Sequence, residues 1–194
     1  MTKPVLLYIF VLFGVVLHTS ESHARDEIAK LCFECHTADN NNPDPIIPKL
    51  IGQDKLYMLR EMNAFKTGKR FDTAMTDIAR NLTDDKELIA IISYFSSQPV
   101  MVGEPSDDPI IEKGKYIYTL KHCEFCHGIK GKLKDTFIDG APVIGGQNKE
   151  YTYKTMLDLR AQKRPTDPYG LMQRSLLSLS SEEMEAISAY LAAQ

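Results

Sequence analysis

Apolar residues recur with helical spacing in two segments of the chain, 83–96 and 180–192. Each segment opens with a hydroxyl residue followed by acids, so we predict Thr83 and Ser180 as N-caps. No stretch alternates apolar and polar residues convincingly between turn signals, so the pattern predicts an all-α fold with little or no sheet. The apolar positions that share one helix face are Leu88, Ile91, Ile92 and Phe95 in the first segment, and Met184, Ile187 and Leu191 in the second.

The middle of the chain interrupts this helical pattern. The stretch Pro99–Asp108 contains two prolines, a glycine and several acids, a composition typical of a linker. Asp108 followed by Pro109 then indicates the start of a further helix that leads to Cys123. We therefore expect two domains, 25–98 and 109–194, joined by the linker 99–108.

The first residues have the features of an export signal. Lys3 precedes the apolar run Pro4–Leu17, and Ser22-His23-Ala24 follows as a small-x-small cleavage site. An uncleaved anchor is the alternative, but the run is shorter than the ~20 apolar residues that span a bilayer. We predict a signal peptide at 1–24 and a periplasmic location.

Two copies of one motif account for all four cysteines of the chain: Cys32-Phe33-Glu34-Cys35-His36 and Cys123-Glu124-Phe125-Cys126-His127. Cys-x-x-Cys-His is the attachment signature of c-type haem, in which two thiols add to the haem vinyl groups and the histidine binds iron. A zinc site, two disulfides or two redox-active dithiols are the alternatives. None of them explains a histidine directly after both cysteine pairs, so we predict two covalently bound haem c groups.

The segments that follow the two motifs are similar. Pro48–Gln53 after the first motif matches Pro142–Gln147 after the second, and a tyrosine follows four residues later in each case, Tyr57 and Tyr151. Both halves then end in the helical segments described above. The sequence thus predicts an internal duplication.

The second axial ligand of each iron follows by elimination. Outside the predicted signal peptide, His36, His127 and His122 are the histidines of the chain, and His122 lies too close to Cys123 to reach the far face of the same haem. Methionine is the natural alternative ligand. Met75 and Met172 match each other in the repeat and are expected in irregular segments just before a capped helix, so we predict them as the second ligands. The methionines expected in core packing or in the linker are Met58, Met62, Met101, Met156 and Met184.

On these motifs, each half resembles a class I cytochrome c. The chain from Arg25 onward is similar to dihaem cytochromes c of the cytochrome c4 family and to the dihaem subunit of flavocytochrome c sulfide dehydrogenase. The resemblance implies two tandem cytochrome c-like domains, each wrapped around one haem with His/Met ligation. It also implies that the carbonyls of Pro48 and Pro142 accept the Nδ1 proton of the iron-binding histidines. The chain departs from the family in a short first helix and in Asn40-Asn41-Asn42, which stands where a Gly-rich stretch is customary.

The function expected from these features is single-electron transfer between redox proteins. The resemblance implies a quinol-oxidising complex as donor and a terminal oxidase or reductase as acceptor. The alternative is the haem subunit of a sulfide dehydrogenase, with a flavoprotein as donor. A dihaem peroxidase is disfavoured, because two six-coordinate irons leave no open site. The net charge of −3 gives no basic signature for nucleic acid, and peripheral membrane association is left open.

Charges differ around the two motifs. Lysines gather near the second motif, at positions 121, 130, 132 and 134, whereas Glu34, Asp39 and Asp44 flank the first. Two ordinary solvated faces are one interpretation. The other is that the lysine-rich edge docks an acidic electron acceptor.

Overall fold

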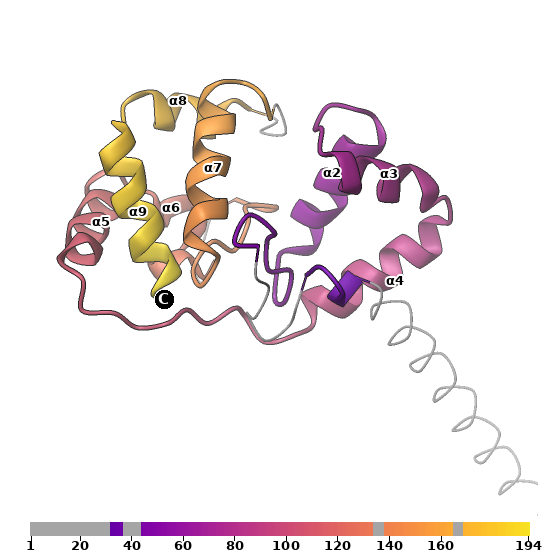
Figure 1. Ribbon diagram of the computed structural model, residues 1–194, viewed down its shortest axis with the longest axis horizontal. Coiled ribbons are helices and arrows are strands. Elements are labelled where there is room, and N and C mark those ends of the chain that lie inside the picture. The colour runs from indigo at the N-terminus through magenta and orange to yellow at the C-terminus, as the bar shows by residue number, and fades with distance from the viewer. Residues whose placement is uncertain (1–31, 37–43, 134–137, 165–168) are drawn as a thin grey trace, which may run out of the picture.

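The computed structural model describes residues 32–36, 44–133, 138–164 and 169–194, so the predicted signal peptide lies outside the described residues. Within these ranges every regular element is helical, as expected for an all-α fold (Figure 1). The helices are α2 (Lys55–Lys66), α3 (Thr73–Asn81), α4 (Asp85–Ser96), α5 (Pro109–Leu120), α6 (Glu124–His127), the short 3₁₀ helix η1 (Ile129–Gly131), α7 (Lys149–Arg160), α8 (Leu171–Leu177) and α9 (Ser181–Ala192).

The helices pack in two groups, which Figure 1 shows side by side. In the first group α2 contacts α3 and α4, and in the second α9 packs against α5 and α7, while α7 also contacts α8. Each group has its own apolar core, one built around Met58, Ile92 and Phe95 and the other around Tyr118, Met184 and Leu191. The chain between α4 and α5 has no regular element at 99–108 and runs along the edge of both groups (Figure 1).

Side-chain caps fix where the helices begin. Ser180 caps α9 with a reciprocal capping box to Glu183, and the carboxylate of Asp108 accepts the Ile110 N–H at the start of α5, as predicted. The prediction for α4 was wrong by one residue. The cap is Asp84 rather than Thr83, because the Asp84 carboxylate accepts the Lys86 N–H and offers the stronger acceptor to the helix terminus.

Gly114 allows α5 and α9 to cross at very short range. A Cβ atom at this position would lie 1.9 Å from the carbonyl oxygen of Ala186 and 2.8 Å from the Cβ of Tyr190. Only a residue without a side chain fits this contact. The crossing buries Ile117, Tyr118 and Tyr190 between the two helices and supports the turn that carries the second Cys-x-x-Cys-His motif.

No helix in the described ranges combines the length and the apolar character that a bilayer span requires.

Candidate haem sites

Both Cys-x-x-Cys-His motifs form the same single turn of helix. The N–H of His127 donates to the carbonyl of Cys123 at 3.0 Å, and the N–H of His36 donates to the carbonyl of Cys32 at 2.8 Å. Residues at i, i+3 and i+4 share one face of such a turn. Both thiols and the imidazole of each motif are therefore presented on the same side.

Burial favours the protonated form of three motif thiols, those of Cys32, Cys123 and Cys126. Burial raises the pKa of Cys32, of Cys126, and of Cys123, the last to about 11. The described residues include no disulfide, and nowhere in them do three or more His, Cys, Asp or Glu side chains gather as metal ligands. The two cysteine pairs belong to different helix groups, which argues against a shared four-cysteine zinc site.

The two motif histidines are buried and oriented by backbone carbonyls. His36 is 8% exposed and donates from Nδ1 to the carbonyl of Pro48 at 2.7 Å, whereas His127 is 5% exposed and donates to Pro142 at 3.1 Å. Burial lowers the pKa of both imidazoles, and the carbonyl bond offsets part of that effect. Each ring is thus neutral, with its proton on Nδ1 and its Nε2 lone pair available to a metal. The contacts expected of Pro48 and Pro142 are confirmed.

Met172 faces the histidine of the second motif. The Nε2 atom of His127 lies 3.4 Å from the Sδ atom of Met172, so the two expected ligand atoms of one iron point toward each other. The ring of His122 stacks on Phe125 instead, with centroids 5.2 Å apart. His127 and Met172, which we predict as the two ligands of one iron, therefore lie side by side in the second group.

The sequence predicted Met75 and Met172 in irregular segments, and this prediction is wrong. Each occupies the first turn of a short helix, α3 or α8. The N–H of Met75 is fixed by the carboxylate of Asp72, the cap of α3, at 3.0 Å. Asp72 also acts electrostatically on His36, which places the start of α3 near the first motif.

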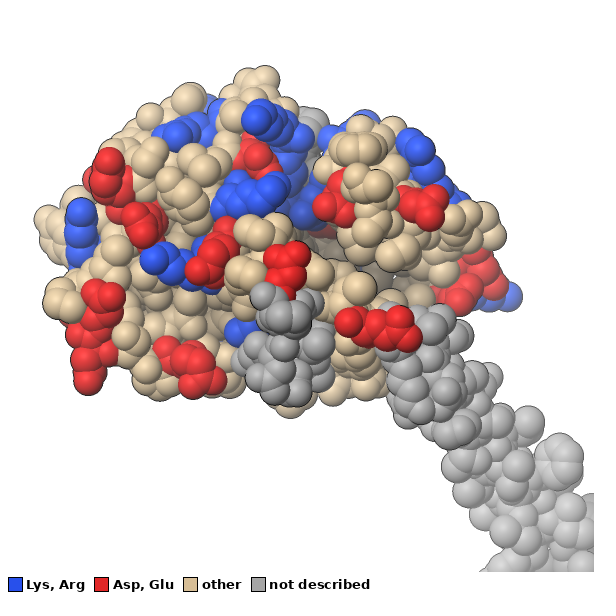
Figure 2. Space-filling view, viewed as in Figure 1, with Lys and Arg blue, Asp and Glu red and all other residues tan. Residues whose placement is uncertain are grey.

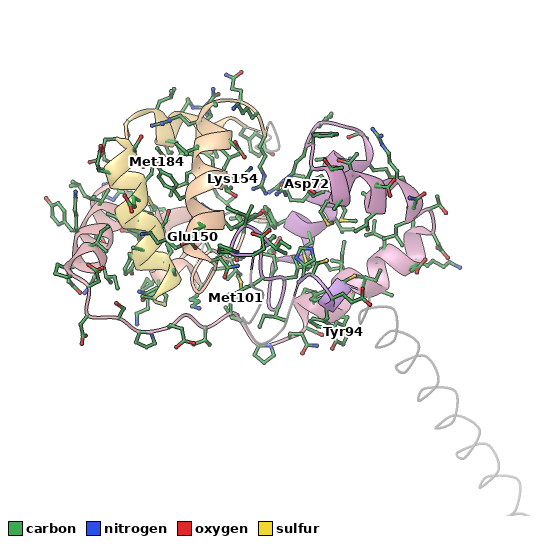
Figure 3. The ribbon with its side chains drawn as sticks, in the orientation of Figure 1. Asp72, Tyr94, Met101, Glu150, Lys154 and Met184 are labelled. Atoms are coloured by element: carbon green, nitrogen blue, oxygen red, sulfur yellow. The ribbon has the colours of Figure 1, made fainter. Side chains whose placement is uncertain are left out.

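The methionines expected in core packing contribute to the two cores, and Met101 of the predicted linker is buried as well. Met58, Met101, Met156 and Met184 are buried, and Met62 packs against the first core. Met101 is fully enclosed although it belongs to the extended segment between the groups, and Figure 3 shows it where the two groups meet.

A buried charged cluster that sequence reasoning missed joins the two groups. Glu61 of α2 accepts hydrogen bonds from Arg70 at 2.7 Å and from Arg164 of the second group at 2.9 Å. Arg164, 5% exposed, also donates to the hydroxyl of Tyr57 at 2.5 Å, and Arg70 donates to that of Tyr151 at 3.2 Å. Burial disfavours ionisation of Tyr151, but Arg164 and Arg70 outweigh it and lower its pKa to about 7.

This cluster fits the anionic edge of haem. Two guanidinium groups, those of the half-buried Arg70 and the buried Arg164, face the carboxylate of Glu61, which leaves an excess of positive charge. Buried charge in proteins is normally compensated. Haem carries two propionate carboxylates. Arg70 lies near enough to His36 to act on its pKa, so the excess charge adjoins the first haem site. The signal in the sequence was the repetition of Tyr57 and Arg70 as Tyr151 and Arg164.

The predicted lysine-rich edge needs one correction. Lys132 is not a free surface charge, because its ammonium group donates to the carbonyl oxygens of Met101, Gly145 and Gln194 and ties the extended segment to the second group. Lys121 and Lys130 are exposed, and Lys134 lies outside the described residues. On the face in Figure 2 acidic and basic side chains are interspersed, with basic ones concentrated over α7.

Comparison with known proteins gives a consistent result. A family model described as Cytochrome c matches residues 111–194. Cytochrome c4 of Pseudomonas aeruginosa is 34% identical over 193 residues, which cover 96% of this chain and 94% of that protein. Cytochrome c4 of Thiocapsa roseopersicina is 32% identical over 168 residues, or 83% of this chain and 85% of that protein.

A solved structure extends the likeness to three dimensions. Reduced recombinant cytochrome c4 from Pseudomonas stutzeri matches with a TM-score of 0.77 and 30% identity, over 88% of this chain and 97% of that one. Paired with the two motifs and their matched histidine environments, these similarities settle the family. The chain belongs to the cytochrome c4 family and is a dihaem c-type cytochrome that transfers electrons.

Proposed function

We propose that each domain binds its own haem with its own side chains. Thioether bonds to Cys32 and Cys35 and axial bonds to His36 and Met75 would hold the first haem. The second would be held in the same way by Cys123, Cys126, His127 and Met172. The observation that carries this assignment is the 3.4 Å approach of His127 Nε2 to Met172 Sδ, with the opposite ring nitrogen bonded to Pro142. The corresponding domains are 25–98 and 109–194, joined by 99–108 and derived from one duplicated unit.

Such a site exchanges electrons and does little else. With His and Met both bound, the iron would have no vacant position for peroxide, oxygen or nitrite, and the haem would supply one-electron exchange. The protein holds the imidazole proton on Nδ1, excludes water by burying both histidines, and sets the local charge through the Glu61–Arg70–Arg164 cluster. We therefore assign the chain as an electron carrier rather than an enzyme.

The carrier would work in the periplasm, after removal of the signal peptide 1–24. Its partners would be redox proteins, with a quinol-oxidising complex or a flavoprotein as donor and a terminal oxidase or reductase as acceptor. The family membership over almost the full length of the cytochrome c4 proteins supports the carrier role.

Two measurements on the purified holoprotein test this function. Mass spectrometry of the denatured chain should show two haem additions to a chain that begins at Arg25, because thioether bonds survive unfolding. The reduced protein should not bind carbon monoxide at neutral pH, whereas a Met172→Ala variant should bind it at one haem and serves as the positive control. One haem per chain, or carbon monoxide binding by the unaltered protein, would overturn the assignment.

A further inference from the structure

Two glutamines cross between the helix groups and bind backbone there in the same way. The side-chain amide of Gln147 accepts the N–H of Lys49 at 3.0 Å and donates to the carbonyl of the same residue at 3.0 Å. Reciprocally, Gln53 accepts the N–H of Val143 at 2.7 Å and donates to its carbonyl at 2.9 Å. Each glutamine is 4% exposed. These four bonds therefore form a dry, two-way link between the halves.

The peptide groups that receive these glutamines are the ones that hold the iron-binding histidines. The peptide bond between Pro48 and Lys49 offers its oxygen to His36 Nδ1 and its N–H to Gln147. The peptide bond between residues 142 and 143 does the same for His127 and Gln53. A glutamine of one half is thus one peptide group away from the histidine of the other half.

Each glutamine is itself held in place by its own half. The Oε1 atom of Gln147 also accepts the N–H of Asn148, just before α7, at 2.9 Å. The Oε1 atom of Gln53 accepts the N–H of Asp54, the cap of α2, at 2.9 Å. Because the amide oxygen is bonded on both sides, its dipole stays aimed at the peptide N–H across the interface.

Hydrogen bonds in such a chain strengthen one another. An acceptor bound to a peptide N–H polarises the peptide group, so the carbonyl oxygen of that group becomes more negative. The carbonyl then accepts a stronger hydrogen bond from the imidazole Nδ1–H. A histidine whose Nδ1 proton is drawn toward a strong acceptor is a more basic ligand and favours the oxidised metal. The effect reaches iron in the opposite half, because the peptide group belongs to that half.

We propose that Gln53 and Gln147 are positioning residues that each lower the reduction potential of the haem in the opposite domain. The proposal rests on ligation of the two irons by His36 and His127. By linkage, a change of oxidation state in one domain must alter the strength of the bond across the interface by the same free energy. The glutamine pair thus couples the redox state of each haem to the contact between the domains.

The test uses leucine variants of the haem-loaded protein. Gln147→Leu should shift the oxidised-to-reduced ratio of the first haem toward the reduced form by about two- to fourfold, since cooperativity adds some 10–30% to a charge-assisted bond. This equals roughly 18–36 mV at 59 mV per tenfold change. Gln53→Leu should act on the second haem instead. Gln98→Leu, which removes a bond confined to the first domain, is the matched control and should move neither potential.

Redox titration followed by NMR resolves the two haems, because signals from each domain report on its own iron. In the unaltered protein, hydrogen exchange of the Lys49 amide should be slower in the oxidised state than in the reduced state. Should a leucine variant fail to take up haem, Gln147→Glu keeps the acceptor oxygen, adds charge, and should lower the first potential instead.

The pattern across variants decides the outcome. If the spectrum of the unaltered protein shows no His/Met ligation, the ligand assignment is refuted and the glutamines have no role in tuning the haems. With that spectrum intact, potentials that stay unchanged in both leucine variants, or that shift only in the domain carrying the substitution, would overturn the cross-domain coupling.

Discussion

Replacing Gly114 with alanine should destabilise the second domain, although alanine is the better helix former. The added Cβ would lie 1.9 Å from the Ala186 carbonyl oxygen, whereas non-bonded carbon contacts are favourable at about 3.5–4.0 Å. The obstacle is backbone of α9 rather than a flexible side chain. Helices α5 and α9 must therefore move apart by roughly 1.5 Å to accept the methyl group.

The size of the effect follows from two opposing contributions. Overpacking of a well-filled contact costs about 1–3 kcal/mol, and the backbone obstacle places this site at the upper end. Alanine returns at most about 1 kcal/mol through its higher helix propensity. The net expected loss is about 2 kcal/mol in the free energy of unfolding. Spreading the helices also loosens the packing of Ile117, Tyr118 and Tyr190.

Guanidinium unfolding of the haem-loaded variant, followed by helical circular dichroism and by the haem absorption band, measures this loss. Lys115→Ala, on the neighbouring exposed position of α5, is the control and should change the midpoint little. A Gly114→Ala protein that is as stable as the parent, or more stable by the helix-propensity gain, would refute the close crossing of α5 and α9.

Three further predictions concern the haem sites and their surroundings. Met75→His or Met172→His should lower the potential of one haem and leave the other nearly unchanged, because imidazole favours ferric iron more than thioether does; a spectroelectrochemical titration with both potentials unaltered would contradict the ligand set. Arg164→Gln should lower the free energy of unfolding by about 1–3 kcal/mol, because it leaves buried partners unsatisfied. Removing a buried cation should also lower the reduction potential of one haem. An unchanged unfolding midpoint together with unchanged potentials would count against the cluster. Lys130→Glu should slow reduction of an acidic acceptor at low salt, and the rate should recover as added salt screens the charge. Lys132→Met should chiefly lower thermal stability. Equal rates of acceptor reduction by Lys130→Glu and the parent at low salt would rule out docking at this edge.

The sequence was informative where one local pattern determines the chemistry. Cys-x-x-Cys-His occupies one helical turn, so its spacing alone places two thiols and an imidazole together. The prolines after each motif could be assigned through the family resemblance, and the hydrogen bonds of His36 and His127 agree with that assignment. Helical periodicity likewise identified α4 and α9, since their apolar faces are long and regular.

Contacts between the halves could not be predicted, because they join residues far apart in the sequence. Gln53 and Gln147 stood out only as matching positions of a repeat, and nothing local shows that each binds the opposite half. Nothing in the local sequence around Arg164 indicates that folding buries it against Glu61 of the other half. Lys132 was misplaced for the same reason: its long side chain reaches three carbonyl groups that only the tertiary structure brings together.

The central claim is that each iron is bound by one histidine and one methionine of its own domain. Proton NMR of the fully reduced protein tests it most directly, because a methyl group bound over the haem face is strongly shielded by the ring current. The account predicts two such three-proton signals far upfield, of which Met75→His removes one and Met172→His the other. A single upfield methyl signal, or two that survive both substitutions, would contradict it.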